Sequence, residues 1–525
     1  MTEDGKTEVG GPVEKEQGED AMPPTYEEAK GLTEEEPKVK ITSSDTKIEM
    51  GKEKEAQEGF KGLTKDELMH YANDPFWVRL RWVLFSLFWV IWAAMLVASV
   101  LIIVQAPKCP SPDPKQWWQK GPVYKFDVTA FPDTNADGNG DLAGVEEQVA
   151  YLVSAGVGTA YFTNLVSTSN LKEVDQDLGT MEEWESLATA LQERGLRVII
   201  DFTTEQTSEM HMWYEEAQAG NAEFSDFYKP GSNELNLENP AVVKELERAL
   251  QFWLEHGVDG FVVRGVGQLP DSVLTTFHGL LESEGEKAGV PKVLLAEDDF
   301  VIVEYSGVGA GKPVHLVNFG SDIVTETTAE GIKSSLDDFI TELTGKCVED
   351  ACPWPAFAIS TVSHGKDKVD ALTMLKMLLP GTVVTTAGEE LGLAGLDFAK
   401  ITEAPESGHL ALYSLLAAKL RHQDAILFGE LTTENSFVKQ GSVFGLTRVK
   451  KGSPGYILVW NLGAEDLTVD LSEVAAMPES IRVLEGASTL AVSPVNEGEE
   501  KRCDSKAVPL LAGQAKIFNF VPNFD

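Results

Sequence analysis

The stretch Gly257-Val-Asp-Gly-Phe-Val-Val-Arg264 is a short apolar run bounded by glycine, and it directly follows an amphipathic run at 241–256. Apolar runs of four to eight residues between turn residues predict buried strands, whereas apolar residues spaced by three and four predict helices. The sequence therefore predicts a helix that leads through a glycine turn into a strand.

The same alternation of helix and strand extends from this stretch in both directions. The predicted strands are 123–130, 158–162, 197–202, 260–263, 293–297, 314–319, 356–361 and 382–386. The clearest predicted helices are 142–154, 181–193, 241–256 and 410–422. Eight strands that alternate with helices predict an α/β fold, a (β/α)8 TIM barrel, over residues 121–425. Short alternating runs without a long helix predict a C-terminal antiparallel β domain over 426–525.

The residues before the barrel have a different character. Residues 1–75 hold 20 acidic residues against 10 lysines and few aromatic residues, which predicts a disordered tail. Positions 82–104 carry no charge, and at about 1.5 Å per residue they span roughly 35 Å, enough for a hydrocarbon core of about 30 Å. We expect one transmembrane helix with its inner flank over 76–106 and a juxtamembrane stalk over 107–120. Trp117 and Trp118 suit either the outer membrane surface or the core of the barrel.

Composition and charge narrow the class of protein. The 525 residues are 43% hydrophobic and carry a formal net charge of −41. Phosphate binding needs clustered lysine and arginine, so nucleic acid is not an expected partner. Arg79 and Arg81 precede the apolar run and a large globular domain follows it, which favours a cytoplasmic N-terminus and an extracellular C-terminus.

Several motifs carry a resemblance to known enzymes. They are Phe131-Pro-Asp-Thr-Asn-Ala-Asp-Gly-Asn-Gly-Asp-Leu-Ala-Gly144, Asp201-Phe-Thr-Thr-Glu-Gln206, Gly257–Arg264, Pro380-Gly-Thr and Gly388-Glu-Glu-Leu-Gly392. In this order they resemble the alpha-amylase superfamily, in particular its α-glucosidase branch. The whole arrangement of acidic tail, one apolar helix, Ala-Pro-Lys-Cys-Pro, a Trp-Trp pair and an amylase-like barrel resembles the heavy chains of heteromeric amino-acid transporters, in particular the 4F2 type.

The resemblance implies a degenerate catalytic site. Retaining glycosidases need two carboxylates about 5–5.5 Å apart, one of them a nucleophile. Arg264 stands at the position of the family's nucleophile and Gly365 at that of its third carboxylate, while Glu297 falls near the general-acid position. A guanidinium cannot attack an anomeric carbon, so we expect no glycosidase activity.

The first of these motifs also predicts a metal site. Asp133, Asn135, Asp137, Asn139 and Asp141 present oxygen atoms at alternate positions of a glycine-containing loop, and hard oxygen ligands suit Ca²⁺. In the resembled α-glucosidases this loop binds a structural calcium ion. The alternative is a plain turn.

Cysteines and small residues suggest further contacts. Cys347 and Cys352 are close in sequence and predict a local disulfide in an oxidising compartment. Cys109 lies just beyond the apolar run and suits an intermolecular disulfide, the alternative being a free or palmitoylated cysteine. Ala94 and Ala98 are spaced for close helix packing or simply face lipid.

The expected function combines these features. The resemblance implies an ancillary chain that binds, stabilises and delivers a multi-helix transporter light chain to the plasma membrane, with membrane lipid around its helix. Pro23, Pro24 and Tyr26 fit a ligand for WW domains, such as those of ubiquitin ligases. The alternatives are a membrane-anchored α-glucosidase and an adhesion or signalling receptor associated with integrins.

Overall fold

The structure is a computed structural model that describes residues 65–72, 74–105, 114–264, 269–297, 316–318, 326–345, 354–357, 366–396, 408–489 and 502–524. The chain forms two compact units, Met1–Cys109 and Pro110–Asp525.

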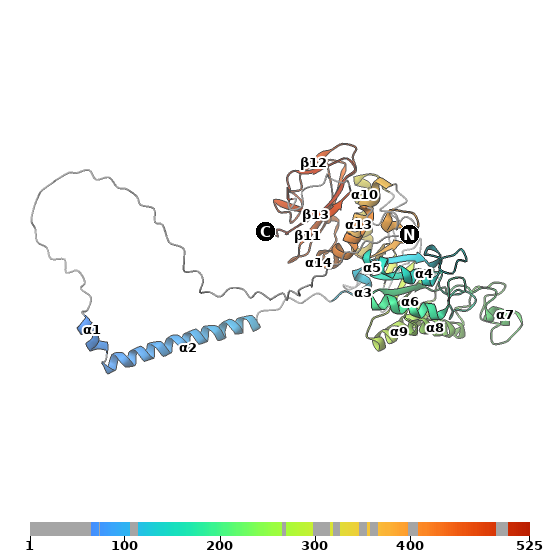
Figure 1. Cartoon of the computed structure of the whole chain (residues 1–525), viewed down its shortest axis with the longest axis horizontal. Coiled ribbons are helices and arrows are strands. Elements are labelled where there is room, and N and C mark those ends of the chain that lie inside the picture. The colour runs from blue at the N-terminus through green and yellow to red at the C-terminus, as the bar shows by residue number, and fades with distance from the viewer. Residues whose placement is uncertain are drawn as a thin grey trace, which may run out of the picture. The chain divides into compact units, whose positions relative to one another are not determined.

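The first unit contains the predicted apolar helix. Helix α1 spans Lys65–Ala72 and α2 spans Pro75–Gln105 (Figure 1). Asp74 accepts a hydrogen bond from the Phe76 amide at 3.0 Å, and Pro75 occupies the first turn, where it replaces an amide that needs no helical partner. Among the described residues, α2 is the one helix that is long and apolar enough to cross a membrane, and none of its residues is buried.

The second unit contains a closed barrel of eight parallel strands in the order of the chain. The strands are β1 (Val123–Asp127), β2 (Thr159–Thr163), β3 (Arg197–Asp201), β4 (Gly260–Arg264), β5 (Val293–Glu297), β6 (Leu316–Asn318), β7 (Trp354–Phe357) and β8 (Thr382–Thr386). β1 pairs with both β2 and β8, which closes the barrel. The predicted (β/α)8 TIM barrel is therefore confirmed.

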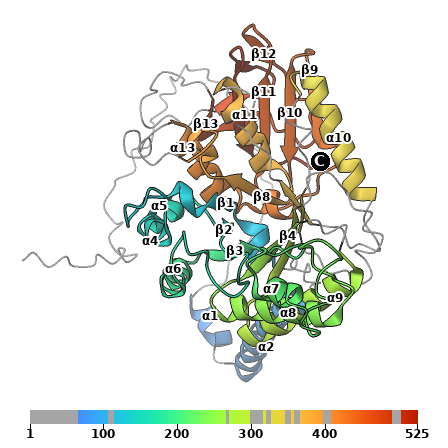
Figure 2. The ribbon, with the colours of Figure 1, turned by 90° about the vertical axis from the view of Figure 1, so that its right-hand side faces the viewer.

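Helices follow most strands and pack around the barrel (Figure 2). They are α3 (Trp117–Lys120), α4 (Leu142–Glu147), α5 (Val149–Ser154), α6 (Met181–Glu193), α7 (Met212–Gln218), α8 (Pro240–Glu255), α9 (Asp271–Ala288), α10 (Ala329–Gly345), α11 (Lys366–Leu378), α13 (Gly408–Leu415) and α14 (Asp424–Phe428). The helix expected at 142–154 is two helices, because the backbone leaves helical geometry at Gln148. The strand expected at 123–130 ends at Asp127, whose side chain accepts from the Thr129 amide and starts a 3₁₀ turn.

The C-terminal strands form a six-stranded sheet in the order β14-β13-β16-β11-β10-β9 and a two-stranded sheet, β12-β15. Their bounds are β9 (Ser436–Lys439), β10 (Val443–Arg448), β11 (Gly455–Asn461), β12 (Leu467–Val469), β13 (Ser480–Ser488), β14 (Arg502–Asp504), β15 (Val508–Leu510) and β16 (Ala515–Phe520). All pairings are antiparallel, as predicted. The larger sheet packs on α10, α11 and α13 (Figure 2).

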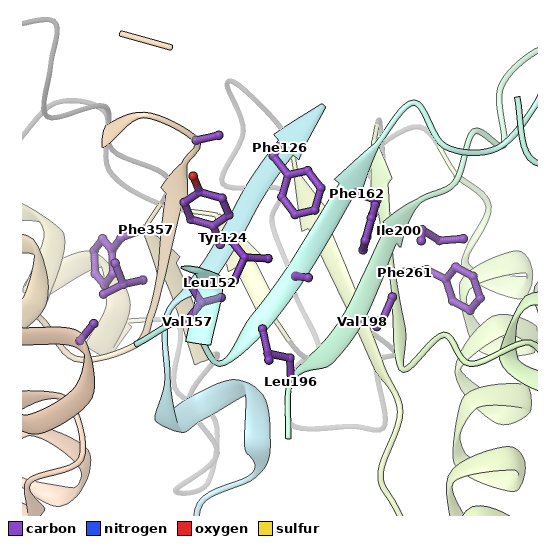
Figure 3. Close-up of a cluster of buried hydrophobic side chains, with 14 of the residues drawn as sticks. Tyr124, Phe126, Leu152, Val157, Phe162, Leu196, Val198, Ile200, Phe261 and Phe357 are labelled. Carbon is purple, nitrogen blue, oxygen red and sulfur yellow. The ribbon is translucent and has the colours of Figure 1, made fainter. Parts of the chain in front are cut away.

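The hydrophobic core has two layers in the barrel. The larger layer lies between strands and helices and includes Tyr124, Phe126, Phe162 and Phe261 (Figure 3). The smaller layer lies inside the barrel, where Val123, Tyr161, Ile199, Val262, Val293, Leu295, Ala356 and Val384 pack around Trp118. The second interpretation of Trp118, as barrel core, is therefore the one that the structure supports.

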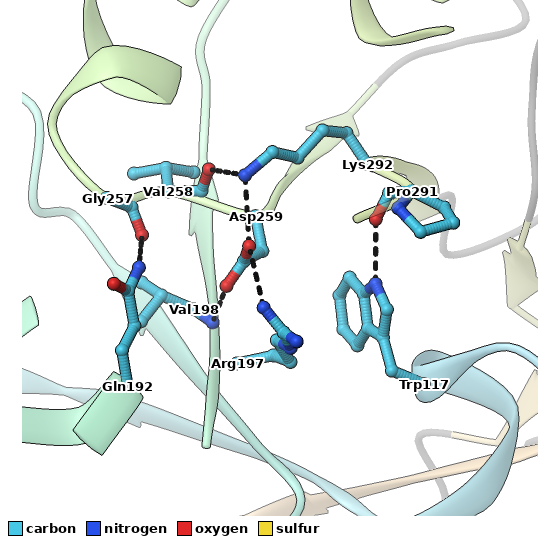
Figure 4. A network of polar contacts seen from close by, with 9 residues as sticks. All are labelled: Trp117, Gln192, Arg197, Val198, Gly257, Val258, Asp259, Pro291 and Lys292. Carbon is cyan, nitrogen blue, oxygen red and sulfur yellow. Dashed lines mark hydrogen bonds and ion pairs between the residues drawn. The ribbon is translucent and has the colours of Figure 1, made fainter. Parts of the chain in front are cut away.

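The end of the barrel at which the strands begin is closed by polar contacts (Figure 4). Asp259, which is 1% exposed, accepts from Lys292 at 3.0 Å, from the Val198 amide at 3.2 Å and from Arg197 at 3.5 Å. Beside this network the Trp117 indole donates to the Pro291 carbonyl at 2.8 Å. The segment before β1 is thus built into this end of the barrel.

Candidate functional site

The candidate site is the end of the barrel at which the strands finish, because catalytic groups of TIM barrels lie there. Arg264 is the last residue of β4 and Glu297 the last residue of β5, and the two are paired in the strand register. Each follows by two residues a position inside the barrel, Val262 and Leu295. The backbone therefore brings the two predicted positions together. Gly365 lies outside the described residues.

A second group of polar side chains at the end where the strands finish was not predicted from the sequence. Asn164, directly after β2, donates through its side chain to Asp127 at 2.9 Å, and its backbone amide donates to Asp201 at 2.9 and 3.1 Å. Asn164 has a φ of 58°, a left-handed conformation that asparagine tolerates better than most residues. The sequence feature that could have predicted this group is that β1 and β3 both end in an aspartate.

These two carboxylates are used within the fold. Asp127 also accepts from the amide and the hydroxyl of Thr129, at 3.0 and 2.7 Å. Burial raises the pKa of the Asp127 carboxyl, but the hydrogen bonds from Thr129 and Asn164 outweigh this effect and hold its pKa below the usual range. An ionised carboxylate with these donors stabilises the strand ends and is poorly suited to donate a proton.

The motif Gly388–Gly392 forms a buried cluster after β8. Glu390 is fully buried and accepts from the hydroxyls of Tyr124 and Tyr151, both at 2.7 Å, and from the Gly388 amide at 2.8 Å. Burial raises the pKa of the Glu390 carboxyl, although these donors oppose the shift. Glu389 accepts from Lys376 at 3.0 Å. The hydrogen bonds of Glu390 and the ion pair of Glu389 therefore hold the turn after β8 in place.

In the predicted metal loop, side-chain oxygens accept hydrogen bonds from backbone amides of the same loop. Asp133 accepts from the amides of Ala136, Asp137 and Gly138 at 2.6, 3.3 and 2.8 Å. Asn135 accepts from Asp137, and Asp137 accepts from Asn139, each at 2.8 Å.

Asp141 has a separate role as the cap of α4, since it accepts from Gly144 at 2.7 Å and from both donors of Thr134 at 2.9 and 2.8 Å. Within the described ranges, no three His, Cys, Asp or Glu side chains are grouped to hold a metal. The oxygen chemistry of this loop fits Ca²⁺, but its carboxylates would have to turn toward one centre.

The other predicted residues fall in two groups. Ala94 and Ala98 lie on α2 and are exposed, one turn apart. Cys109, Cys347, Cys352, Pro23, Pro24 and Tyr26 lie outside the described residues. The tail predicted to be disordered over 1–75 is described only at 65–72 and 74–75, and there the prediction is wrong, because α1 spans Lys65–Ala72 and α2 begins at Pro75.

Comparison with known proteins gives two family models. The model of the solute carrier family 3 member 2 N-terminus matches residues 45–124, and that of the alpha amylase catalytic domain matches residues 128–234. The first match includes α2, and the second includes β2 and β3.

Curated relatives include both transporter heavy chains and glycosidases. The amino acid transporter heavy chain SLC3A2 of Oryctolagus cuniculus is 29% identical over 65% of this chain and 61% of the relative. SLC3A1 of Homo sapiens is 25% identical over 66% of this chain and 63% of the relative. The chain thus spans less than two thirds of the length of these heavy chains. The alpha-glucosidase of Culex pipiens is 22% identical over 74% of this chain and 89% of that protein.

Solved structures show the same fold. The trehalose-6-phosphate hydrolase of Bacillus licheniformis has a TM-score of 0.60 at 18% identity, covering 77% of this chain and all of the hydrolase chain. Together with the two family models, these relatives confirm the resemblance predicted from the motifs: the N-terminal part of the chain is similar to that of the solute carrier family 3 heavy chains, and its barrel is similar to that of the alpha-amylase proteins.

Proposed function

We propose that the chain is the ancillary heavy chain of an amino-acid transporter, which binds a multi-helix light chain, stabilises it and delivers it to the plasma membrane. The observation that carries the proposal is the match of residues 45–124 to the solute carrier family 3 member 2 N-terminus, because that segment includes the apolar helix and the stalk. A single helix cannot enclose a solute pathway, so the light chain would carry the amino acid.

Under this proposal the chain is not an enzyme. In the strand register, Glu297 has Arg264 as its neighbour where a retaining glycosidase needs a second carboxylate. A cation at this position would also oppose the positive charge that develops on the sugar ring. The rival function, a membrane-anchored α-glucosidase, draws on the likeness to the Culex pipiens enzyme. Hydrolysis of an aryl α-glucoside above a no-enzyme control would favour that rival.

The proposed topology is a single-pass type II membrane protein. Helix α2 would cross the bilayer, with residues 1–75 in the cytoplasm and the barrel outside the cell. The light chain would meet the heavy chain at two places: a disulfide from Cys109, and helix packing on the side of α2 that carries Ala94 and Ala98. A disulfide formed outside the cell would persist because that compartment is oxidising.

Depletion of the chain from cells tests the proposal. The proposed function predicts that a multi-span amino-acid transporter disappears from the surface fraction and that amino-acid uptake falls with it. Re-expression of the full chain should restore both. If surface transporters are unchanged and integrin-dependent adhesion is lost instead, the receptor function replaces this one.

A further inference from the structure

Two arginine side chains are buried close to α14, between the barrel and the C-terminal sheet. The first, Arg421, lies three residues before α14 and is 1% exposed. One terminal nitrogen of its guanidinium donates to the backbone oxygens of Met377 and Leu379, at 3.2 and 2.8 Å, and the other donates to that of Gly381. These carbonyls lie at the end of α11 and just before β8, so Arg421 is at the end of the barrel where the strands begin.

The second, Arg448, is the last residue of β10 and is fully buried. One of its terminal nitrogens donates to the backbone oxygens of Ile426 and Gly429, both at 2.8 Å. Ile426 is part of α14 and Gly429 directly follows it. The two arginines therefore come from different layers of the fold and meet around one short helix.

Neither arginine obtains a negative charge from a side chain. In the part of the chain that the structure describes, both guanidiniums bind backbone carbonyls and no carboxylate. Three of their donor atoms, Nε of Arg421 and Nε and Nη1 of Arg448, have no hydrogen-bond partner among these residues. Buried charges are normally paired and buried donors normally hydrogen-bonded, so this cluster is suited to a ligand that supplies both charge and acceptor.

The surroundings of the two arginines are electropositive. Burial lowers the pKa of Arg421 to about 10, and burial followed by the charge of Arg421 lowers the pKa of Arg448 to about 9. Both side chains therefore remain charged at neutral pH, and each is close enough to feel the other. The pKa of His422 is also lowered, by burial and then by the charges of Arg421 and Lys120. An anion at this position would relieve the repulsion within the cluster.

We propose that Arg421 and Arg448 form a buried site for a small monovalent anion, for which chloride is the expected ligand. A halide accepts several N–H donors at once and carries the charge that the backbone carbonyls do not supply. An ordered water could accept from the same donors but would leave both cations without a counter-charge. The site lies at the opposite end of the barrel from Arg264 and Glu297, and it does not depend on the proposed transporter partner.

Thermal unfolding of the full chain in detergent tests the site, starting from protein dialysed into sodium gluconate. Replacement of gluconate by chloride at constant ionic strength should raise the melting temperature by about 3 °C and then saturate, because a ligand bound only by the folded state stabilises it by mass action. Bromide should act like chloride, whereas gluconate is too large for a close-packed interior. Equal melting temperatures in gluconate and chloride would overturn the proposal and leave water as the partner of these donors.

Two arginine variants separate the buried site from general effects of salt. Arg448→Met removes two of the three donor atoms and one charge, so the response to chloride should be lost. Arg248→Met is the matched control and should retain the response, since Arg248 pairs with Glu245 on the exposed side of α8. A chloride response that persists in Arg448→Met would contradict the proposal. Should that variant not fold, anomalous scattering from wild-type crystals grown in bromide decides: a peak beside both guanidiniums supports the site, and no peak there refutes it.

Discussion

The two ends of the barrel use their polar side chains differently. Where the strands begin, Asp259 is buried beside Lys292, and the partly exposed Arg197 lies 3.5 Å from it. The indole of Trp117 donates to the Pro291 carbonyl nearby. Where the strands finish, Asp127 and Asp201 are joined by the exposed residue Asn164. Asp259 and Lys292 are buried charges that depend on each other, whereas Asp127, Asn164 and Asp201 retain access to water. The strand-finish end also holds one buried pair, Lys376 and Glu389, in the turn after β8.

This difference indicates which end can change. Loss of one member of a buried ion pair leaves an uncompensated charge. When a partly exposed hydrogen bond is lost, water can take the place of the missing partner. Substitution of a partly exposed group such as Asn164 should therefore cost the fold less than loss of a member of the buried Asp259–Lys292 pair.

The largest effect is expected at the strand-start end. Asp259→Ala leaves Lys292, whose side chain is 9% exposed, without its carboxylate. We expect a loss of about 3–5 kcal/mol in the free energy of unfolding. Chemical denaturation of the full chain, followed at the tryptophans, measures it. A loss below about 1 kcal/mol would show that the two ends do not differ as described.

Acid should act on the strand-finish side through His211. Its Nδ1 accepts from the Trp213 amide at 3.1 Å and caps α7, and burial lowers the pKa of the ring to about 4. The pKa of the His211 ring is lower in the folded chain than the value of about 6.5 that it has in the unfolded chain. The free energy of unfolding therefore keeps its full value above about pH 6.5 and falls as the pH drops toward 4, by up to about 3 kcal/mol.

His211→Asn keeps an acceptor at the cap but removes the titration. The variant should flatten the pH dependence of thermal unfolding over this window. If wild type and variant lose stability equally on acidification, other groups cause the loss.

Calcium offers a test of the loop at 131–144. If Ca²⁺ binds the folded loop, an ion concentration about 100 times the dissociation constant adds roughly 2.7 kcal/mol of stability. A chelator should then lower the melting temperature of the wild type but leave that of Asp137→Ala unchanged. A melting temperature that does not respond to chelator in either protein would identify the loop as a turn held by its own amides.

The smallest effect is expected for Asn164→Ala. The substitution removes the donor to Asp127 and places alanine at a positive φ. Because Asn164 is exposed, we expect a loss of about 1 kcal/mol, well below that of Asp259→Ala. A loss as large as that of Asp259→Ala would remove the contrast between the ends.

Much of this fold could be predicted from the alternation of short apolar runs and amphipathic runs. The predicted bounds of the strands at Val293–Glu297 and Thr382–Thr386 agree with the structure, because both are short runs rich in apolar and β-branched residues. The strand predicted at 123–130 was too long, because a hydrogen bond from the Thr129 amide to the Asp127 side chain ends it at Asp127. A pattern of apolar residues gives no information on such local hydrogen bonds.

The site was predictable only where it follows strand ends. Arg264 and Glu297 could be placed because each terminates a strand. The link through Asn164 joins residues 37 positions apart on each side, and the contact of Arg421 with Gly381 spans 40 positions. Such contacts depend on the closed barrel and on helix packing, which no local pattern specifies.

Non-reducing electrophoresis of the full chain from cell membranes, with mass spectrometry of what is linked to it, tests the central claim most directly. The heavy-chain function predicts a reducible high-mass band that contains a multi-span amino-acid transporter. Cys109→Ser should abolish this band, and Cys503→Ser should leave it intact. A band without a transporter, or one that survives Cys109→Ser, would contradict the account.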